Sequence, residues 1–151
     1  MFRKIVSGGQ TGVDRAALDF ALANGIEHGG WCPKGRRAED GMLDERYNLN
    51  ETPRRDYRQR TEWNVRDSDG TLIIINRELS GGSLYTLEAA WNTGKPVMVV
   101  CLVDGTEEML VAGWLKNNGV NVLNVAGPRA SSEPAIYDMA LELLGKIYLS
   151  R

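Results

Sequence analysis

Short apolar runs alternate with amphipathic stretches along the whole chain. The apolar runs predict strands at Arg3–Ser7, Ile26–Trp31, Thr71–Asn76, Pro96–Val103 and Asn121–Val125. The amphipathic stretches predict helices at Val13–Asn24, Thr61–Asp67, Ser83–Asn92, Glu107–Asn118 and Glu133–Leu149. Strands that alternate with helices indicate an α/β fold of three layers, with a mostly parallel sheet and helices on both faces. We expect one domain, residues 1–151, because no internal boundary stands out.

Two features modify this pattern. The runs Thr71–Asn76 and Pro96–Val103 are continuously apolar, which is typical of buried strands in a parallel sheet. The segment from Pro33 to about Arg60 has no clear period and is rich in arginine and glycine. A connection of this length is uncommon in a compact domain unless it is disordered or functional, and its composition favours a binding loop.

Composition narrows the class of protein. The chain has 151 residues, 42% hydrophobic and 25% charged, and a formal net charge of -2, which argues against a dedicated duplex-DNA binder. No apolar run is long enough to span a membrane, and no signal-type region precedes the first strand, so we expect a cytoplasmic protein. Cys32 and Cys101 indicate no disulfide framework, and Cys101 is expected in the core. His28 and Cys32 lack further ligands nearby, so no metal site is expected.

The polar and glycine-rich turns all follow predicted strands. Parallel strands bring their carboxyl ends to one edge of the sheet, where ligands of open α/β folds bind. The turns that meet there are Ser7–Gly12, Trp31–Arg60, Asn76–Ser83, Asp104–Thr106 and Ala126–Ser132. Their shared position predicts a ligand site at this edge.

The first turn joins a strand directly to a helix, an arrangement whose free backbone N–H groups favour anions. The alternative is a tight turn whose glycines only supply positive φ. The turn lacks the lysine of a Walker A loop and the glycine spacing of a dinucleotide fingerprint. Asp14 either complements the helix dipole or meets a hydroxyl or ring N–H of a ligand, since its charge would repel a phosphate. The candidate contacts of this turn are Gly8, Gly9, Gln10, Thr11, Gly12 and Asp14.

The later turns supply further candidates. Gly81, Gly82 and Ser83 open a helix, and Glu88 lies at the edge of its apolar stripe, Leu84, Leu87 and Trp91. That carboxylate reaches solvent, is satisfied by a neighbouring donor, or is held for a ligand. In the last turn, Ser132 as N-cap with Pro134 just inside explains the helix start without a ligand, which leaves Arg129, with Ser131, for a phosphate. Lys34 and Arg36 follow a strand end and could close over an anion.

These segments resemble the family of molybdenum carrier proteins, also described as circularly permuted YpsA-like proteins. The matching segments include residues 7–16, 30–36, 38–41, 67–71, 81–82 and 124–129, with Tyr47, Leu49, Glu51, Arg60, Thr61, Asn64 and Val65 between them. The resemblance covers nearly the whole chain in the same order. It implies a Rossmann-like fold of the SMF/DprA–LOG group, a homo-oligomer, either dimer or tetramer, and binding of molybdenum cofactor (molybdopterin) or a nucleotide.

The resemblance has one departure. The nucleotide-cleaving LOG enzymes carry Gly-Gly-x-Gly-Thr-x-x-Glu, and here Gly81, Gly82 and Glu88 keep their places while Leu84-Tyr85 replace Gly-Thr. We therefore expect a carrier or binding protein for a phosphorylated heterocycle, foremost molybdenum cofactor. The alternatives are a LOG-type hydrolase of a nucleotide or ADP-ribose, using Glu88 and Asp14, and a single-strand nucleic-acid binder. The third would use Arg54, Arg55, Tyr57, Arg58 and Arg60, and the net charge argues against it.

Overall fold

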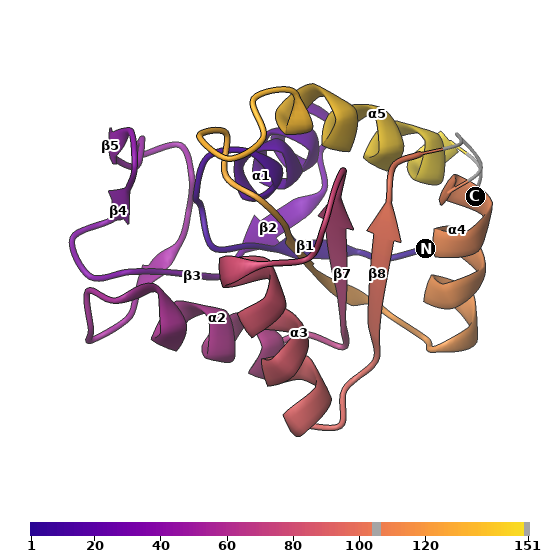
Figure 1. Cartoon of the computed structure of the whole chain (residues 1–151), viewed down its shortest axis with the longest axis horizontal. Helices are drawn as coiled ribbons and strands as arrows, with labels where there is room; N and C mark the ends of the chain where they lie inside the picture. Colours follow the sequence, from indigo (N-terminus) through magenta and orange to yellow (C-terminus); the bar gives the residue numbers. More distant parts are fainter. Residues whose placement is uncertain (104–106, 150–151) are drawn as a thin grey trace.

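A computed structural model of the chain describes residues 1–103 and 107–149 (Figure 1). Within these residues a main sheet of five parallel strands has the order β2-β1-β9-β7-β8. Its strands are β1 (Lys4–Val6), β2 (Glu27–Gly29), β7 (Gly70–Ile75), β8 (Val97–Cys101) and β9 (Val122–Ala126). The predicted parallel sheet is confirmed, and the carboxyl ends of β1, β9 and β7 lie next to one another at one edge.

Helices cover both faces of this sheet, as the sequence predicts. Helices α1 (Val13–Ala23) and α5 (Ile136–Leu149) pack together on one face, and α4 (Glu107–Asn117) packs against α5 and β8. Helices α2 (Tyr57–Arg66) and α3 (Gly81–Asn92) pack together on the other face (Figure 1). The result is a three-layer Rossmann-like fold in which α1 and α3 both begin at the carboxyl edge of the sheet.

The core lies mainly between the sheet and the α1–α5 layer. Ile5, Leu72, Ile74, Leu123 and Val125 from the central strands are fully buried there. A second apolar cluster, which includes Leu43, Tyr47 and Leu49, lies beyond α1 under the long polar segment. Burial of apolar surface therefore orders part of a segment that has no hydrophobic period.

The strand predicted at Ile26–Trp31 is two strands. Gly30 separates them with φ 120°, and a Cβ there would lie 2.7 Å from the carbonyl oxygen of Ser7. The chain leaves the main sheet at this glycine, and β3 (Trp31–Cys32) pairs in parallel with β6 (Asn50–Glu51) instead. The side chain of Asn64 on α2 accepts from the backbone N–H of Trp31 at 2.8 Å and donates to its carbonyl at 3.0 Å.

The segment Pro33–Arg60 is ordered rather than structureless. It contains β6 and a small antiparallel hairpin, β4 (Arg37–Ala38) and β5 (Gly41–Met42), which lies at the far end of the molecule from α4 (Figure 1). Helix α2 begins at Tyr57, four residues before the predicted start. Asp56 caps it, because its carboxylate accepts from the backbone N–H groups of Arg58 and Gln59.

Other boundaries also differ from prediction. Strand β8 is an edge strand and Val99 is exposed, so the prediction of a buried strand was wrong there. Cys101, at its end, is only half-buried, so it is no core residue; both thiols are free. Helix α5 begins at Ile136 rather than Glu133, because the N–H groups of Ser132 and Glu133 bond back to the carbonyl of Arg129. Ser132 is therefore not its N-cap. None of the described helices is long and apolar enough to cross a membrane.

Candidate functional site

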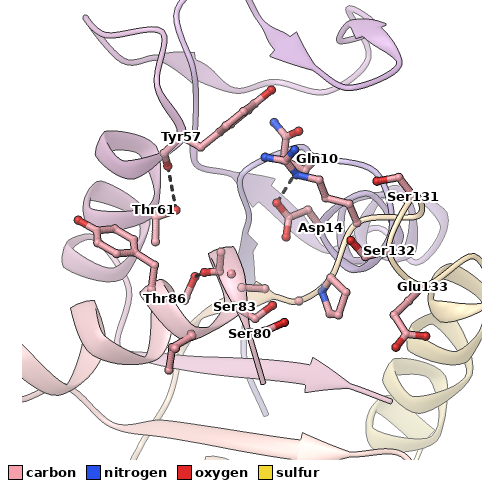
Figure 2. Close-up of a pocket in the computed structure, with 18 of the residues that line it drawn as sticks. Gln10, Asp14, Tyr57, Thr61, Ser80, Ser83, Thr86, Ser131, Ser132 and Glu133 are labelled. Atoms are coloured by element: carbon pink, nitrogen blue, oxygen red, sulfur yellow. Dashed lines mark hydrogen bonds between the residues drawn. The ribbon is translucent and has the colours of Figure 1, made fainter. Parts of the chain in front are cut away.

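A cleft of about 830 Å³ opens at the carboxyl edge of the sheet, between the starts of α1, α2 and α3 and the turn after β9 (Figure 2). Several predicted site residues line it: Gln10, Asp14, Gly81, Gly82, Ser83, Glu88, Arg129 and Ser131. Residues outside the predicted set also line it, notably Tyr57, Arg58, Arg60, Thr61, Ser80, Thr86, Arg77 and Glu133. The predicted turn Asp104–Thr106 lies outside the described residues.

The start of α3 forms one wall of the cleft. Gly81 has φ 53°, and Cβ atoms built at Gly81 or Gly82 would meet no atom within 4 Å among the described residues. Ser80 precedes the helix in extended conformation, and its side chain makes no capping hydrogen bond. The first N–H groups of a helix lack intrahelical acceptors, so this wall presents backbone donors and a positive dipole end to the cleft.

Asp14 and Arg60 form the opposite wall. The Asp14 carboxylate is 3% exposed, accepts from the backbone N–H of Gln10 at 3.3 Å and lies 3.6 Å from Nη1 of Arg60. Burial raises the pKa of Asp14, and the charge of Arg60 opposes that shift. Burial likewise lowers the pKa of Arg60, against the charge of Asp14. One ion pair thus offsets only part of the desolvation of both groups.

Two buried polar atoms on this wall have no hydrogen-bond partner within the described part of the chain. They are Oε1 of Gln10 and Nε of Arg60. The Gln10 side chain donates through Nε2 to the carbonyl of Arg37 at 3.0 Å, which fixes the orientation of its amide. Unpaired buried polar atoms are costly and uncommon, so their presence beside a cleft points to a ligand or to ordered water.

Tyr57 lies at the centre of an arginine cluster beside this wall. The guanidinium carbon of Arg129 is 4.3 Å from the Tyr57 ring centroid, and that of Arg37 is 4.6 Å from it. Arg60 is 5.7 Å away. Arg129 also contributes to the charge environment of Asp14. The cluster joins α2 to the turn after β9 and makes this end of the cleft cationic.

Glu88 and Glu133 lie at the rim. Glu88 is exposed, and the stripe next to it is exposed as well, with Leu84 39% and Trp91 76% accessible. The exposed position of Glu88 agrees with the alternative that its carboxylate reaches solvent. Glu133 lies 3.4 Å from Nε of the exposed Arg77. The sequence offered no way to tell which face of α3 packs on the sheet.

The first glycine turn is packed against its neighbours. A Cβ at Gly8 would lie 2.5 Å from Nη1 of Arg60, and one at Gly9 would lie 2.7 Å from the side chain of Leu43. At Gly12, with φ 81°, it would lie 2.3 Å from the carbonyl oxygen of Pro128. None of these three glycines lines the cleft. Their absent side chains let other segments approach the backbone, and Gly9 and Gly12 also supply the positive φ of the alternative considered for this turn.

Glu39 closes this region from the β4–β5 hairpin. Its carboxylate accepts from the hydroxyl of Thr11 and, at 2.6 Å, from the hydroxyl of Ser131. It also accepts from the backbone N–H of Ser131 at 3.2 Å, and these bonds, those from Ser131 first, lower the pKa of Glu39. Thr11 and Ser131 are thus already paired with a carboxylate of the chain itself.

Lys34 and Arg36 lie away from the cleft. The guanidinium of Arg36 donates to the carbonyls of Asp44 at 2.8 Å and Tyr47 at 2.7 Å, and more weakly to two others nearby. It therefore holds the loop over the second apolar cluster. Lys34 is exposed, and neither residue lines the cleft, so the structure does not bring the predicted cation pair to the site.

Sequence reasoning named Tyr57 and Arg60 only for the nucleic-acid alternative and missed them as residues of this cleft. Both belong to an arginine-rich stretch for which the sequence predicts a solvated basic loop. In the structure this stretch is helical, and the Arg60 side chain is only 11% exposed, next to the buried Thr61. The signal available was the spacing of four between Arg60 and the polar Asn64, also buried on α2. No group of three or more His, Cys, Asp or Glu side chains within residues 1–103 and 107–149 could hold a metal ion.

Comparison with known proteins identifies the family. Residues 5–148 match the family described as Circularly permutated YpsA SLOG. The chain belongs to this family. The match spans nearly the entire chain and confirms the resemblance inferred from the motifs.

A solved structure supports the assignment. The chain is 48% identical to a protein from Syntrophus aciditrophicus SB described as a "putative molybdenum carrier protein". The similarity covers 97% of this chain and 94% of that chain, with a TM-score of 0.95. A comparison with curated proteins gave no match.

Proposed function

We propose that this member of the YpsA SLOG family is a carrier or binding protein for a phosphorylated heterocycle, foremost molybdenum cofactor, and that residues 1–151 act as one domain. The observation that carries the proposal is the pairing of two unlike walls across one cleft. The open start of α3 offers backbone donors, and the facing wall offers the buried Asp14, Arg60 and Gln10.

Each wall binds a different part of the ligand. Asp14 would repel a phosphate, so the phosphate goes to Gly81, Gly82 and Ser83 at the start of α3, where the helix dipole favours an anion. Arg129, at the same cleft, supplies a positive charge for it. The heterocycle then lies toward Asp14 and Gln10. The name of the 48% identical protein supports this assignment of ligand.

The hydrolase alternative is not favoured. It needs Glu88 as an acid–base group, and this side chain is exposed at the rim of the cleft. The Leu84-Tyr85 replacement within the LOG motif points the same way. A binding role requires neither a catalytic Glu88 nor the Gly-Thr pair of the LOG motif.

Two further proposals concern the oligomeric state and the cellular location of the protein. Trp91 is 76% exposed and lies on α3, and Val99 is 36% exposed on the neighbouring edge strand β8. Exposed large apolar side chains of this kind support a homo-oligomer, dimer or tetramer. The free thiols of Cys32 and Cys101 are compatible with the reducing cytoplasm, where we place the protein.

Native mass spectrometry of the purified protein with molybdopterin, ADP-ribose and a nucleoside monophosphate tests the binding role. We expect one of these phosphorylated ligands, foremost molybdopterin, to remain bound. The Arg129→Ala variant should bind it more weakly by roughly 1–3 kcal/mol, because a charged hydrogen-bond partner is lost. Arg46→Ala, which removes a guanidinium over Tyr47 outside the cleft, is the matched control. Unchanged affinity in Arg129→Ala would exclude Arg129 from the site, and failure of all three ligands to bind would contradict the proposed function.

A further inference from the structure

The wall of the cleft formed by Gln10, Asp14 and Arg60 has a definite hydrogen-bonding pattern. Oε1 of Gln10 is an acceptor, and its amide cannot rotate to present the nitrogen, because Nε2 is held by the carbonyl of Arg37. The Asp14 carboxylate is a second acceptor. Nε of Arg60 is a donor, and like Oε1 of Gln10 it has no partner among the described residues.

The three residues that carry these groups are in contact through Asp14. The Asp14 carboxylate contacts the backbone N–H of Gln10 at 3.3 Å and lies 3.6 Å from Nη1 of Arg60. Figure 2 shows Asp14 between Gln10 and the serines Ser83 and Ser80, and all four residues line the cleft. A ligand that satisfies this wall must therefore present adjacent donors next to an acceptor.

We propose that the cleft selects heterocycles with the edge of a 2-amino-4-oxopyrimidine ring, which pterin and guanine share, over those that lack the 2-amino group. Such an edge carries an amino N–H, a ring N–H and a carbonyl oxygen in a row. The amino and ring N–H groups pair with Asp14 and with Oε1 of Gln10, and the carbonyl accepts from Arg60. This inference rests on the proposed function, because it assigns the ring end of the same ligand.

Arg129 occupies the place where this ring would stack. Its guanidinium has the same N–C–N donor pattern as the 2-amino edge, and it lies 4.3 Å from the Tyr57 centroid while contributing to the charge environment of Asp14. For the ring to take this face of Tyr57, Arg129 has to leave it, and its charge then becomes available to the phosphate.

Other heterocycles fit this wall less well. Hypoxanthine keeps the ring N–H and the carbonyl but has no 2-amino group, so one acceptor stays unpaired. Adenine presents a ring acceptor instead of a ring N–H, and that acceptor would face the carboxylate. A site built to pair with a donor rejects ligands that lack it, because its buried acceptor is then left without a partner.

Matched ligand pairs test the proposal with the unmodified protein by isothermal titration calorimetry. The pairs are GMP with IMP, and a pterin monophosphate with the lumazine analogue that has 2-oxo in place of 2-amino. We expect the 2-amino member of each pair to bind about tenfold more tightly or better, and AMP to bind more weakly than IMP. Equal affinity within both pairs overturns this inference and leaves the proposed function intact. If no member of either pair binds, this inference falls, and the proposed function then depends on the mass-spectrometry result.

The Asp14→Asn variant tests the contribution of the Asp14 carboxylate to this preference. The amide keeps the size of the side chain but replaces one acceptor with a donor, so the preference within each pair should fall from about tenfold to less than about threefold, because the 2-amino group loses its charged acceptor. Tyr57→Leu, with Tyr57→Phe as its control, should weaken both members of a pair equally, since it removes only stacking. A full preference in a folded Asp14→Asn variant contradicts the assigned role of Asp14.

Discussion

The two glycine-rich turns of this protein have the same sequence pattern and opposite surroundings. Ser7–Gly12 joins β1 to α1, and Ser80–Ser83 lies at the start of α3 after β7, both at the carboxyl edge of the sheet. A Cβ at Gly12 would lie 2.3 Å from a backbone carbonyl oxygen, whereas one at Gly82 would meet nothing within 4 Å in the described part of the chain. The first turn is closed by packing and the second is open to the cleft.

This difference separates two uses of glycine. In the first turn, the missing side chains let Arg60, Leu43 and the turn at Pro128 approach the backbone. In the second, they leave the first N–H groups of α3 accessible to a ligand. A strand–glycine–helix motif therefore predicts a ligand loop only when no other segment fills the space above it.

The largest expected effect is a loss of stability when a side chain is added in the closed turn, Ser7–Gly12. Gly12→Ala should lower the free energy of unfolding by about 2–4 kcal/mol, because the new Cβ collides with the carbonyl of Pro128 and φ 81° strains an L-residue. Gly82→Ala is the matched control in the open turn, where alanine should leave stability unchanged or raise it by about 0.5–1 kcal/mol. Urea unfolding of both variants measures the contrast, and equal effects would contradict it.

A smaller loss of unfolding free energy is expected when Arg60, which packs on the closed turn, is replaced. Arg60→Met keeps the stem of the side chain but leaves the Asp14 carboxylate buried without its cation, at a cost of about 2–3 kcal/mol. Asp14 has a raised pKa, so it protonates readily and the deficit should shrink as pH falls. Asp14→Asn in the same chain should recover part of the stability. A deficit that neither acid nor this second change reduces would show that the ion pair is not the cause.

The smallest expected effect is the pH-dependent stabilisation by Glu39, whose carboxylate accepts hydrogen bonds from Thr11 and Ser131. Because the pKa of Glu39 lies below its ordinary 4.5, the folded protein binds fewer protons than the unfolded chain around that pH. The stabilisation is full above the ordinary pKa and declines as pH falls through the lowered one. Unfolding free energies should therefore favour wild type over Glu39→Gln at about pH 7, and the gap should narrow as pH falls below 4.5. Glu45→Gln, in the same segment, is the control, and a gap that persists in acid would contradict the interpretation.

The fold was largely predictable from the sequence. The Leu72–Ile75 run and the other apolar runs correctly predict the parallel strands, and strand–helix alternation predicts the layers. The order of strands in space is not encoded in any local pattern, so the edge position of β8 and the exposure of Val99 could not be foreseen. The split at Gly30 depends on a close approach to Ser7, which only tertiary packing creates.

The candidate site was predictable in part. The position of turns after strands correctly brings Gly82, Asp14 and Arg129 to one cleft. It fails for Arg36, because the sequence does not show that backbone carbonyls surround the guanidinium. It fails for Arg60 because the helix that turns this side chain inward begins earlier than the polar pattern suggests.

The central claim is that the open start of α3 binds the phosphate of the ligand. Calorimetry of molybdopterin binding to wild type, Gly82→Asp and Gly113→Asp tests it most directly. Gly113 lies on α4 and also has open space around its Cβ, so its variant is the matched control. We predict that Gly82→Asp binds at least about tenfold more weakly while it remains as stable as wild type, since an acid in the first helical turn is favoured by the dipole. Gly113→Asp should bind like wild type. Wild-type affinity in Gly82→Asp would contradict the account.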